Sequence, residues 1–373
     1  MMVIMKLVYI ANMRLPTERA HGIQVMKMCE ALADVQSPTP LNITLIVPRR
    51  LHKLKADPCA YYGVRKNFTI IRVPCVDTAR WGKLGFFVET ISFLAAAKVF
   101  LLFKKYDMVY TREPLAGVFF KNSIVELHTL PKKTLFFHRF VWRRAKKLIV
   151  LTRFINDVLV SGGIAAEKII VAPDGVDVKA FDIQVTSAQA RGNLRLPPDK
   201  KIVMYAGLFD EWKGYRTLLD ASKLFDPDIT LAMIGGASEQ IEKLKKEYPK
   251  VIFFGYRQYT ELPVNQKAAD VLVIPNSGKQ DISKYHTSPL KVFAHMASGR
   301  PIVASDLPSL REVLNETNAV LVVPDDASAL TAGIQRVFAD REFAEQIAGQ
   351  ALQDVRRYSW QVRTHNVLLT LSI

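Results

Sequence analysis

The sequence predicts an α/β protein with two domains, each built on a parallel sheet that helices cover on both faces. Short apolar runs alternate with longer segments of helical periodicity, which is typical of buried parallel strands joined by helices. This alternation is interrupted by a polar link around Thr186–Lys201 and then begins again. A chain of 373 residues with 49% apolar residues can form two separate cores.

The apolar runs give the expected strands in chain order. In the first half we expect Leu7–Ile10, Ile43–Val47, Ile70–Val73, Met108–Tyr110, Ser123–Glu126, Leu148–Leu151 and Ile169–Val171. In the second half we expect Ile202–Ala206, Thr230–Ile234, Val251–Phe254, Val271–Ile274, Ile302–Ala304 and Val320–Val322. The clearest helices between them are Gln24–Ala33, Tyr215–Leu224, Glu239–Glu247, Ala327–Phe338 and Ala344–Tyr358. The predicted domains span residues 1–180 and 181–355.

The segment 286–306 carries the strongest functional pattern. Ser288 is expected to cap a helix that Pro289 opens, and Gly299 ends that helix before a short apolar strand. The N-terminus of a helix suits a phosphate, and Lys291 adds a positive charge within the first turn. A capped helix before a strand also occurs in α/β proteins without an anion site.

Two runs in this segment, Met296-Ala-Ser-Gly299 and Pro301–Ser305, resemble the nucleotide-sugar site of the retaining glycosyltransferases of family 4. Members of that family carry two glutamates around the helix start. In this chain their positions hold His286 and Ala294. The resemblance assigns donor binding here to His286, Ser288, Pro289, Leu290, Lys291 and Ala294.

The resemblance covers nearly the whole chain and implies the GT-B fold. This fold has two doubly wound Rossmann-like domains with the active site in the cleft between them. The implied co-substrate is a nucleotide-diphosphate sugar, and the implied reaction retains the anomeric configuration. Residues 356–373 resemble the C-terminal segment with which the family crosses back to the first domain.

Strand ends in the first half supply further candidates. Gly22 lies at an expected helix start, where its backbone is predicted to approach the donor, and His21 precedes it on the acceptor side. His128 follows a strand, a position from which an imidazole can donate to a sugar hydroxyl. The resemblance implies that His128 faces the transferred sugar, whereas a lone histidine is more often structural. Arg112 follows another strand and is expected to meet an acceptor phosphate.

The second half has a similar set. Gly207 follows a strand, and Lys213 near the next helix start is expected to stabilise the leaving diphosphate. The family has an arginine directly after the first glycine, where this chain has Leu208, so Lys291 is expected to supply part of the phosphate clamp. Strand-end turns that resemble the walls of the nucleobase pocket contain Gly235, Gly236 and Tyr256.

No metal and no other cofactor is expected. We read Asp226-Pro-Asp228 and Asp174-Gly-Val-Asp177 as turns, because neither has a cluster of metal ligands around it in the sequence. Cys29, Cys59 and Cys75 cannot all pair with one another, which favours a reducing cytoplasm. The N-terminal residues are interpreted as a first strand and not as a signal peptide.

The positive charge is concentrated in the first half. Residues 1–180 contain 28 Lys and Arg against 13 Asp and Glu, a net charge of +15, and residues 181–373 contain 23 against 22, a net charge of +1. Such a lobe attracts an anionic membrane, a phosphate-bearing acceptor or nucleic acid, but it is also compatible with a solvated basic surface. The apolar stretch Leu84–Phe103 contains Glu89 and Lys98, which favours a buried or interfacial helix over a membrane span.

The sequence therefore predicts a retaining glycosyltransferase that acts on a membrane-associated, lipid-linked or polysaccharide acceptor in the synthesis of the cell envelope. We expect it in the cytoplasm, peripheral on the inner face of the membrane. Three alternatives stay open. They are a catalytically impaired relative that still binds its ligand, an epimerase of the same fold, and a nucleic-acid-binding protein. The last is disfavoured because the basic residues form no recognised nucleic-acid-binding motif.

Overall fold

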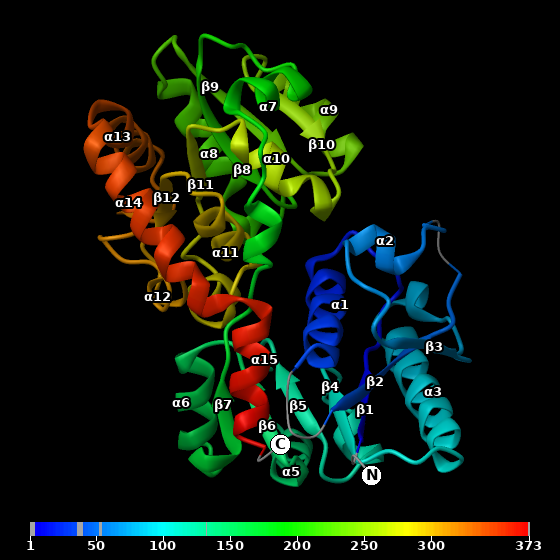
Figure 1. Ribbon diagram of the computed structural model, residues 1–373. Coiled ribbons are helices and arrows are strands. Elements are labelled where there is room, and N and C mark those ends of the chain that lie inside the picture. The colour runs from blue at the N-terminus through cyan, green and yellow to red at the C-terminus, as the bar shows by residue number, and fades with distance from the viewer. Residues whose placement is uncertain (1–3, 36–39, 52–53, 132, 372–373) are drawn as a thin grey trace. The chain divides into compact units, whose positions relative to one another are not determined.

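The computed structural model describes residues 4–371 except 36–39, 52–53 and 132, and the chain divides into two compact units (Figure 1). Unit 1 comprises residues 1–173 and 360–373, and unit 2 comprises residues 174–359. The expected boundaries, after residues 180 and 355, lie close to these divisions. Of the expected C-terminal segment 356–373, residues 360–373 belong to unit 1 and residues 356–359 belong to unit 2.

Unit 1 contains a parallel sheet of seven described strands in the order β3-β2-β1-β4-β5-β6-β7. The strands are β1 (Met5–Ile10), β2 (Leu41–Pro48), β3 (Thr69–Val73), β4 (Met108–Thr111), β5 (Ile124–Leu127), β6 (Lys147–Val150) and β7 (Ile169–Val171). The order reverses between β1 and β4. In open α/β sheets, ligands bind outside the carboxyl ends of the strands at such a reversal.

Helices cover both faces of this sheet. They are α1 (Ala20–Ala33), α2 (Pro58–Tyr62), α3 (Gly82–Leu102), α4 (Ala116–Phe119), α5 (Phe136–Arg144), α6 (Arg153–Ser161) and α15 (Trp360–Leu369). Phe93, Leu94 and Ala97 of α3 pack on the strand residues Val8 and Ile46. The C-terminal helix α15, red in Figure 1, packs against α1 of the same unit.

Unit 2 contains a second parallel sheet, with six described strands in the order β10-β9-β8-β11-β12-β13. The strands are β8 (Lys201–Ala206), β9 (Ile229–Ile234), β10 (Ile252–Gly255), β11 (Val271–Ile274), β12 (Ile302–Ser305) and β13 (Val320–Val322). The order reverses between β8 and β11. Every strand that the sequence predicts overlaps an observed strand, and the predicted parallel α/β architecture is confirmed.

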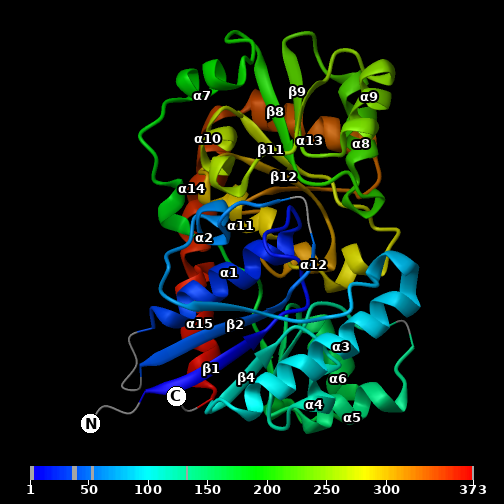
Figure 2. The same cartoon turned by 90° about the vertical axis from the view of Figure 1, so that its right-hand side faces the viewer.

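The helices of unit 2 lie on both faces of its sheet (Figure 2). They are α7 (Ser187–Leu194), α8 (Tyr215–Ala221), α9 (Ser238–Glu247), α10 (Leu262–Lys267), α11 (Leu290–Ala297), α12 (Pro308–Arg311), α13 (Ala327–Ala339) and α14 (Arg341–Asp354). Successive side chains of β8 point to opposite faces of the sheet. Val203 and Tyr205 pack in one apolar cluster, and Ile202 and Met204 pack in another.

One prediction about an element is wrong. The polar stretch expected to be a link, Thr186–Lys201, contains helix α7. The Thr186 hydroxyl accepts a hydrogen bond from the Gln189 amide (3.2 Å), and the Gln189 side chain accepts one from the Thr186 amide (2.9 Å). This capping box starts the helix, and burial of Ala190 and Leu194 holds it on the unit.

Helix α3 is the single candidate for a membrane span among the described helices. It is long and apolar enough by length and composition, but 39% of its most apolar window is buried. Its buried face carries Glu89, which forms an ion pair with Arg50 after β2. Helix α3 therefore covers the sheet of unit 1 with one face and exposes an apolar second face.

Candidate functional site

The carboxyl edge of the unit 2 sheet brings the predicted glycines together. The Gly207 amide donates to the Ile234 carbonyl (2.9 Å), and the Gly235 amide donates to the Gly255 carbonyl (2.7 Å). Gly235 has a φ of +115°, and a Cβ atom there would lie 1.9 Å from the Gly207 carbonyl oxygen. The close approach of these strand-end turns therefore requires glycine.

The loop after β8 is fixed against the end of β11. Gly214 has a φ of +66°, and a Cβ atom there would lie 1.6 Å from the Pro275 carbonyl oxygen. The Ser277 amide donates to the Trp212 carbonyl (3.0 Å). Lys213 is thereby placed beside the reversal of strand order, with its Nζ 2.9 Å from Asp210 Oδ2. This is the strand edge at which a ligand is expected.

The helix start that the sequence predicts is present, but its cap is not. Helix α11 begins at Leu290, one residue later than expected, with Pro289 at the N-cap position and no side-chain cap. The Ser288 hydroxyl accepts a hydrogen bond from the Asp174 amide (3.0 Å), the first residue of unit 2. The predicted capping role of Ser288 is therefore wrong, because its hydroxyl oxygen accepts from the backbone amide of Asp174 and not from an amide of α11.

Lys291 in the first turn of α11 is the most unusual side chain at this edge. Its ammonium nitrogen is buried without a hydrogen-bond partner and lies 5.0 Å from the centre of the Tyr205 ring. Burial, and then the positive charge of Lys213, lowers its pKa well below the ordinary value. Asn276, which follows β11, also has an unpartnered buried amide. Two lysines and a helix N-terminus together form a place suited to an anionic group.

The two positions where the family has glutamates differ in their surroundings. Ala294 is 1% exposed and lies one turn after Lys291 on α11. His286 is half-buried at the end of the helical turn Ile282–His286, and burial lowers its pKa. The sequence analysis did not single out His295, which is buried and whose Nδ1 accepts a hydrogen bond from Gln266 Nε2 (2.8 Å). Burial, and then Lys291, lowers the pKa of His295 to about 3.

The remaining donor-side candidates lie at the start of α11 and in the turns that follow β9 and β10. Leu290 is the half-buried first residue of α11, and Tyr256 is partly exposed directly after β10. At Gly236, a Cβ atom would lie 2.5 Å from the Phe209 ring, so this glycine leaves room for a core aromatic.

A pocket of about 740 Å³ in unit 2 lies at the opposite, amino edge of the sheet. It is lined by Lys201 at the start of β8 and by Pro301 just before β12. Its arginines are already bound, since Arg191 contacts Asp270 Oδ2 (2.6 Å) and Arg300 contacts the Lys267 carbonyl (2.7 Å). We therefore place the ligand edge at the carboxyl ends of the strands and not in this pocket.

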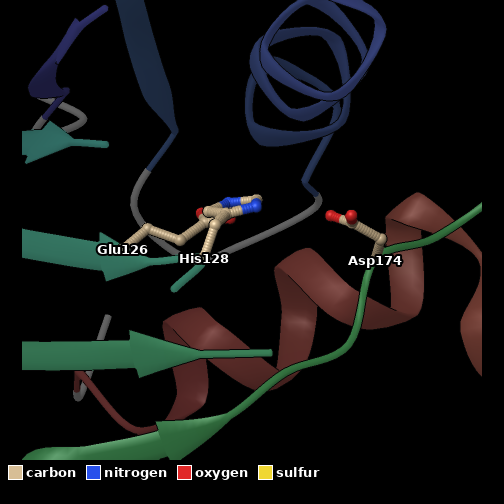
Figure 3. A group of neighbouring side chains, drawn as sticks. All are labelled: Glu126, His128 and Asp174. Carbon is tan, nitrogen blue, oxygen red and sulfur yellow. The ribbon is translucent and has the colours of Figure 1, made fainter. Parts of the chain in front are cut away.

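In unit 1, Glu126 near the end of β5 is the centre of a buried polar network, and Figure 3 draws Glu126 with His128. It accepts hydrogen bonds from Tyr110, from Gln24 Nε2 (2.7 Å) and from Arg363 Nη2 of α15 (3.0 Å). His128 Nε2 lies 2.6 Å from Glu126 Oε1. Burial alone would raise the pKa of Glu126, but Arg363 and His128 bring it well below its usual value. Glu126 is therefore an ionised carboxylate.

The acceptor-side candidates adjoin this network. Arg112 Nη1 donates to Gln24 Oε1 (2.7 Å) and, at 3.4 Å, to the His21 carbonyl. Burial, and then the charges of Arg112 and Arg19, lowers the pKa of His21 to about 4. The structure thus brings His21, Arg112 and His128 to one edge of the unit 1 sheet.

Gly22 has a packing reason to be glycine. It lies inside α1, and a Cβ atom there would lie 2.2 Å from the Tyr62 hydroxyl and 2.7 Å from Thr17. Protein atoms therefore occupy the space that a side chain would need. Its role in binding a donor stays a prediction.

Glu126 and His128 of unit 1 are residue types that can bind a metal ion, and Figure 3 draws both side chains. Within unit 1, the neighbours of Glu126 are the donors Arg363, Gln24 and Tyr110. A guanidinium beside the carboxylate competes with a cation, so this network favours charge pairing over metal binding.

Comparison with known proteins finds a family match in unit 2, which contains Lys213 and Lys291. Residues 200–340 match the family described as glycosyl transferases group 1. This match covers the part of unit 2 that contains β8 to α13. An uncharacterized glycosyltransferase of Methanocaldococcus jannaschii is 28% identical over 52% of this chain and 51% of its own length. The phosphatidyl-myo-inositol mannosyltransferase of Mycobacterium tuberculosis is 30% identical over 52% of each chain. The chain thus spans about half the length of the curated relatives it matches.

Solved structures resemble the chain over nearly its whole length. The sucrose-phosphate synthase of Thermosynechococcus elongatus has a TM-score of 0.79 at 22% identity and covers 99% of this chain and 98% of its own. HepE of Anabaena, in complex with UDP and glucose, has a TM-score of 0.76 at 17% identity and covers 99% of both chains. At these identities the likeness shows the fold, which is the expected GT-B fold of two Rossmann-like units.

Proposed function

We propose that this protein transfers a sugar from a nucleotide-diphosphate sugar to a membrane-associated or otherwise anionic acceptor, with retention of the anomeric configuration. The observation that carries the proposal is the buried Lys291 ammonium without a hydrogen-bond partner, beside Lys213 and the start of α11. Burying an unpaired cation is unfavourable, so this arrangement is best explained by an anionic ligand that both lysines contact.

The chemistry in this proposal is mainly electrostatic. As the bond from the sugar to the diphosphate breaks, Lys213, Lys291 and the amides at the start of α11 stabilise the negative charge on the leaving group. His128 of unit 1 contacts a hydroxyl of the transferred sugar, and Arg112 and His21 contact the acceptor. Same-face attack, assisted by the leaving phosphate, gives retention. No step requires a metal ion.

A second candidate is a relative that binds its ligand but turns it over poorly. Ala294 and His286 favour it, because neither supplies the carboxylate that the family pattern has at these positions. Without a carboxylate at position 294, Lys291 lacks an anionic neighbour within its own helix. Binding without transfer would distinguish this candidate from an active enzyme.

The test begins with nucleotide sugars and the variant Lys213→Ala. A donor present at a hundred times its dissociation constant stabilises the wild type by about 2.7 kcal/mol, which a thermal-shift screen detects. Lys213→Ala should lower transfer by about 100- to 1,000-fold, because one preorganised donor to the leaving group is lost.

The matched control is Lys223→Ala. Lys223 also forms an (i, i+3) pair, with Asp220 at 3.0 Å, but it lies at the opposite end of α8. Its removal should leave transfer unchanged. Full activity of Lys213→Ala with every accepted donor would contradict the proposed clamp.

The acceptor surface in this proposal is an apolar and basic face of unit 1. The face comprises the exposed apolar residues Trp81, Leu84, Phe86, Phe87 and Val88 around the start of α3 and Leu135, Phe136 and Phe140 around α5. Helix α4 contacts both α3 and α5, so the two groups lie on neighbouring elements. Exposed Arg139 and Arg143 interleave with the aromatics of α5. Large apolar side chains beside cations fit an anionic lipid surface.

Vesicle sedimentation tests this surface. Phe86→Ser and Phe136→Ser together, or charge reversal at Arg139, Arg143 and Lys146, should weaken binding to anionic vesicles. Each cation near the surface contributes about 1 kcal/mol and its effect falls as salt rises. Leu224→Ser is the control, because Leu224 is an exposed apolar residue of unit 2. Unchanged binding in both variants would leave the face as a solvated surface.

A further inference from the structure

The buried guanidinium of Arg363 joins the C-terminal helix to the candidate sugar-binding residue. Arg363 is 4% exposed and lies in α15. Its Nε donates to the Pro173 carbonyl (2.8 Å), and its Nη2 donates to the Ala172 carbonyl (3.2 Å) and to Glu126 Oε1 (3.0 Å). These bonds hold the guanidinium plane in one orientation.

The same carboxylate oxygen contacts His128. Glu126 Oε1 lies 2.6 Å from His128 Nε2 and 2.7 Å from Gln24 Nε2. Because Glu126 is an ionised acceptor, Nε2 of His128 carries the hydrogen of this bond. The carboxylate therefore fixes both the ring orientation of His128 and the nitrogen that holds its hydrogen.

Arg363 makes this arrangement possible in a buried place. A carboxylate that is 1% exposed becomes protonated or moves unless a cation compensates its charge. Tyr110 and Gln24 donate hydrogen bonds to Glu126 but carry no charge. Among the described residues that donate to Glu126, Arg363 supplies a full and permanent positive charge.

We propose that Arg363 is a positioning residue, which acts through Glu126 to hold the imidazole of His128 in the orientation and tautomer that contact the transferred sugar. The inference rests on the proposed transferase function. It gives the C-terminal segment a role in the reaction, because Arg363 contacts Glu126, which lies 237 positions earlier in the chain.

The first test compares Arg363→Met with Arg363→Lys. Methionine keeps much of the packing and removes the charge, whereas lysine keeps the charge. We expect Arg363→Met to lower kcat at least tenfold with little change in KM for the nucleotide sugar, and Arg363→Lys to restore part of kcat. Assays are run well below the melting temperature of each variant. Equal kcat in Arg363→Met and wild type would overturn the proposal.

The control for packing is Val367→Ala in the same helix. Val367 is fully buried but makes no hydrogen bond to Glu126 through its apolar side chain, so its truncation should lower the melting temperature and leave kcat unchanged. A double-mutant cycle adds a second criterion. In the His128→Ala background, Arg363→Met should lower kcat no further, whereas an additive loss would mean that Arg363 does not act through His128.

An NMR measurement that does not depend on sugar transfer tests this inference separately from the proposed function. In ¹⁵N-NMR spectra, His128 of the wild type should show the Nε2–H form, and Arg363→Met should show a mixture of forms. If the wild type transfers no sugar from any donor, the proposed function fails, and the spectra alone decide the coupling. An identical His128 spectrum in both proteins would overturn it.

Discussion

Lys291 and Ala294, one helical turn apart on α11, determine the charge at the carboxyl edge of the unit 2 sheet. Lys291 holds a buried ammonium without a hydrogen-bond partner, and Ala294 offers none. A residue at this spacing on a helix faces the same side, so position 294 is where a partner for Lys291 within α11 would lie. The proposed anionic ligand would supply the partner that the free protein does not give Lys291.

Lys291→Met should therefore stabilise the free protein while it weakens ligand binding. An unpartnered buried polar group destabilises the folded state by about 1–3 kcal/mol. The folded pKa of Lys291 is lowered from 10.5, so between these two pKa values the unfolded chain binds more protons and wild-type stability rises with pH. The advantage of the variant should shrink as the pH rises through this interval towards 10.5. Denaturant unfolding of both proteins across this range measures it, and a difference independent of pH would contradict the assignment.

Ala294→Glu tests the family pattern directly. A carboxylate at this position gives Lys291 a partner and gives the donor's ribose hydroxyls an acceptor, and a hydrogen bond to a charged group contributes about 1.5–3 kcal/mol. Calorimetry should show roughly ten- to a hundredfold tighter binding of the nucleotide sugar, with faster transfer. Ala294→Met is the control for added volume in this buried place. Equal or weaker affinity in the glutamate variant would mean that the donor lies differently here.

At the scale of elements, helix α3 has buried polar side chains on one side and exposed apolar side chains on the other. Its buried side carries Glu89 and Thr90, which contact Arg50 and Asn12 at the carboxyl ends of β2 and β1. Its other side exposes Leu84, Phe86 and Phe87. The ion pair thus fixes the helix on the sheet and leaves the apolar side turned outward.

Glu89→Gln should destabilise unit 1 strongly. Both side chains of the Arg50–Glu89 pair are buried, at 5% and 0% exposed, and removing one partner leaves an uncompensated charge at a cost of about 3–5 kcal/mol. The control is Glu242→Gln in the exposed Glu242–Lys245 pair, where the change should be below about 1 kcal/mol. Chemical denaturation measures both, and similar losses in the two variants would refute a special role for the buried pair.

At the scale of the whole molecule, the two units differ in how the chain builds them. Unit 2 is continuous from 174 to 359, and its ends meet where the Val176 amide donates to the Tyr358 carbonyl (3.0 Å). Unit 1 needs two pieces, because α15 supplies Arg363 to Glu126. Folding of unit 1 therefore depends on the last residues of the chain.

Residues 174–359 should accordingly fold as an isolated fragment, with a cooperative thermal transition by circular dichroism and with retained nucleotide binding. Residues 1–173 alone should be destabilised by about 3–5 kcal/mol, since Glu126 loses its buried cation. Melting curves of both fragments beside the full chain provide the comparison. A stable fragment 1–173 together with an unfolded fragment 174–359 would reverse this description.

The sequence by itself determined the strands, the parallel α/β class and the strand-end positions of Gly207, Lys213 and His128. Burial on two faces and turns at strand ends leave a local periodic pattern, which can be recognised without knowing the fold. The capping box of α7 was also a local signal, although the polar composition around it concealed the helix. Tertiary structure alone decided which distant groups meet. Arg363 pairs with Glu126, and the Ser288 hydroxyl accepts a hydrogen bond from the Asp174 amide. Lys291 has no hydrogen-bond partner for its ammonium. These outcomes depend on packing between segments far apart in the chain, and no local pattern records the hydrogen bonds or charges that a folded neighbour supplies.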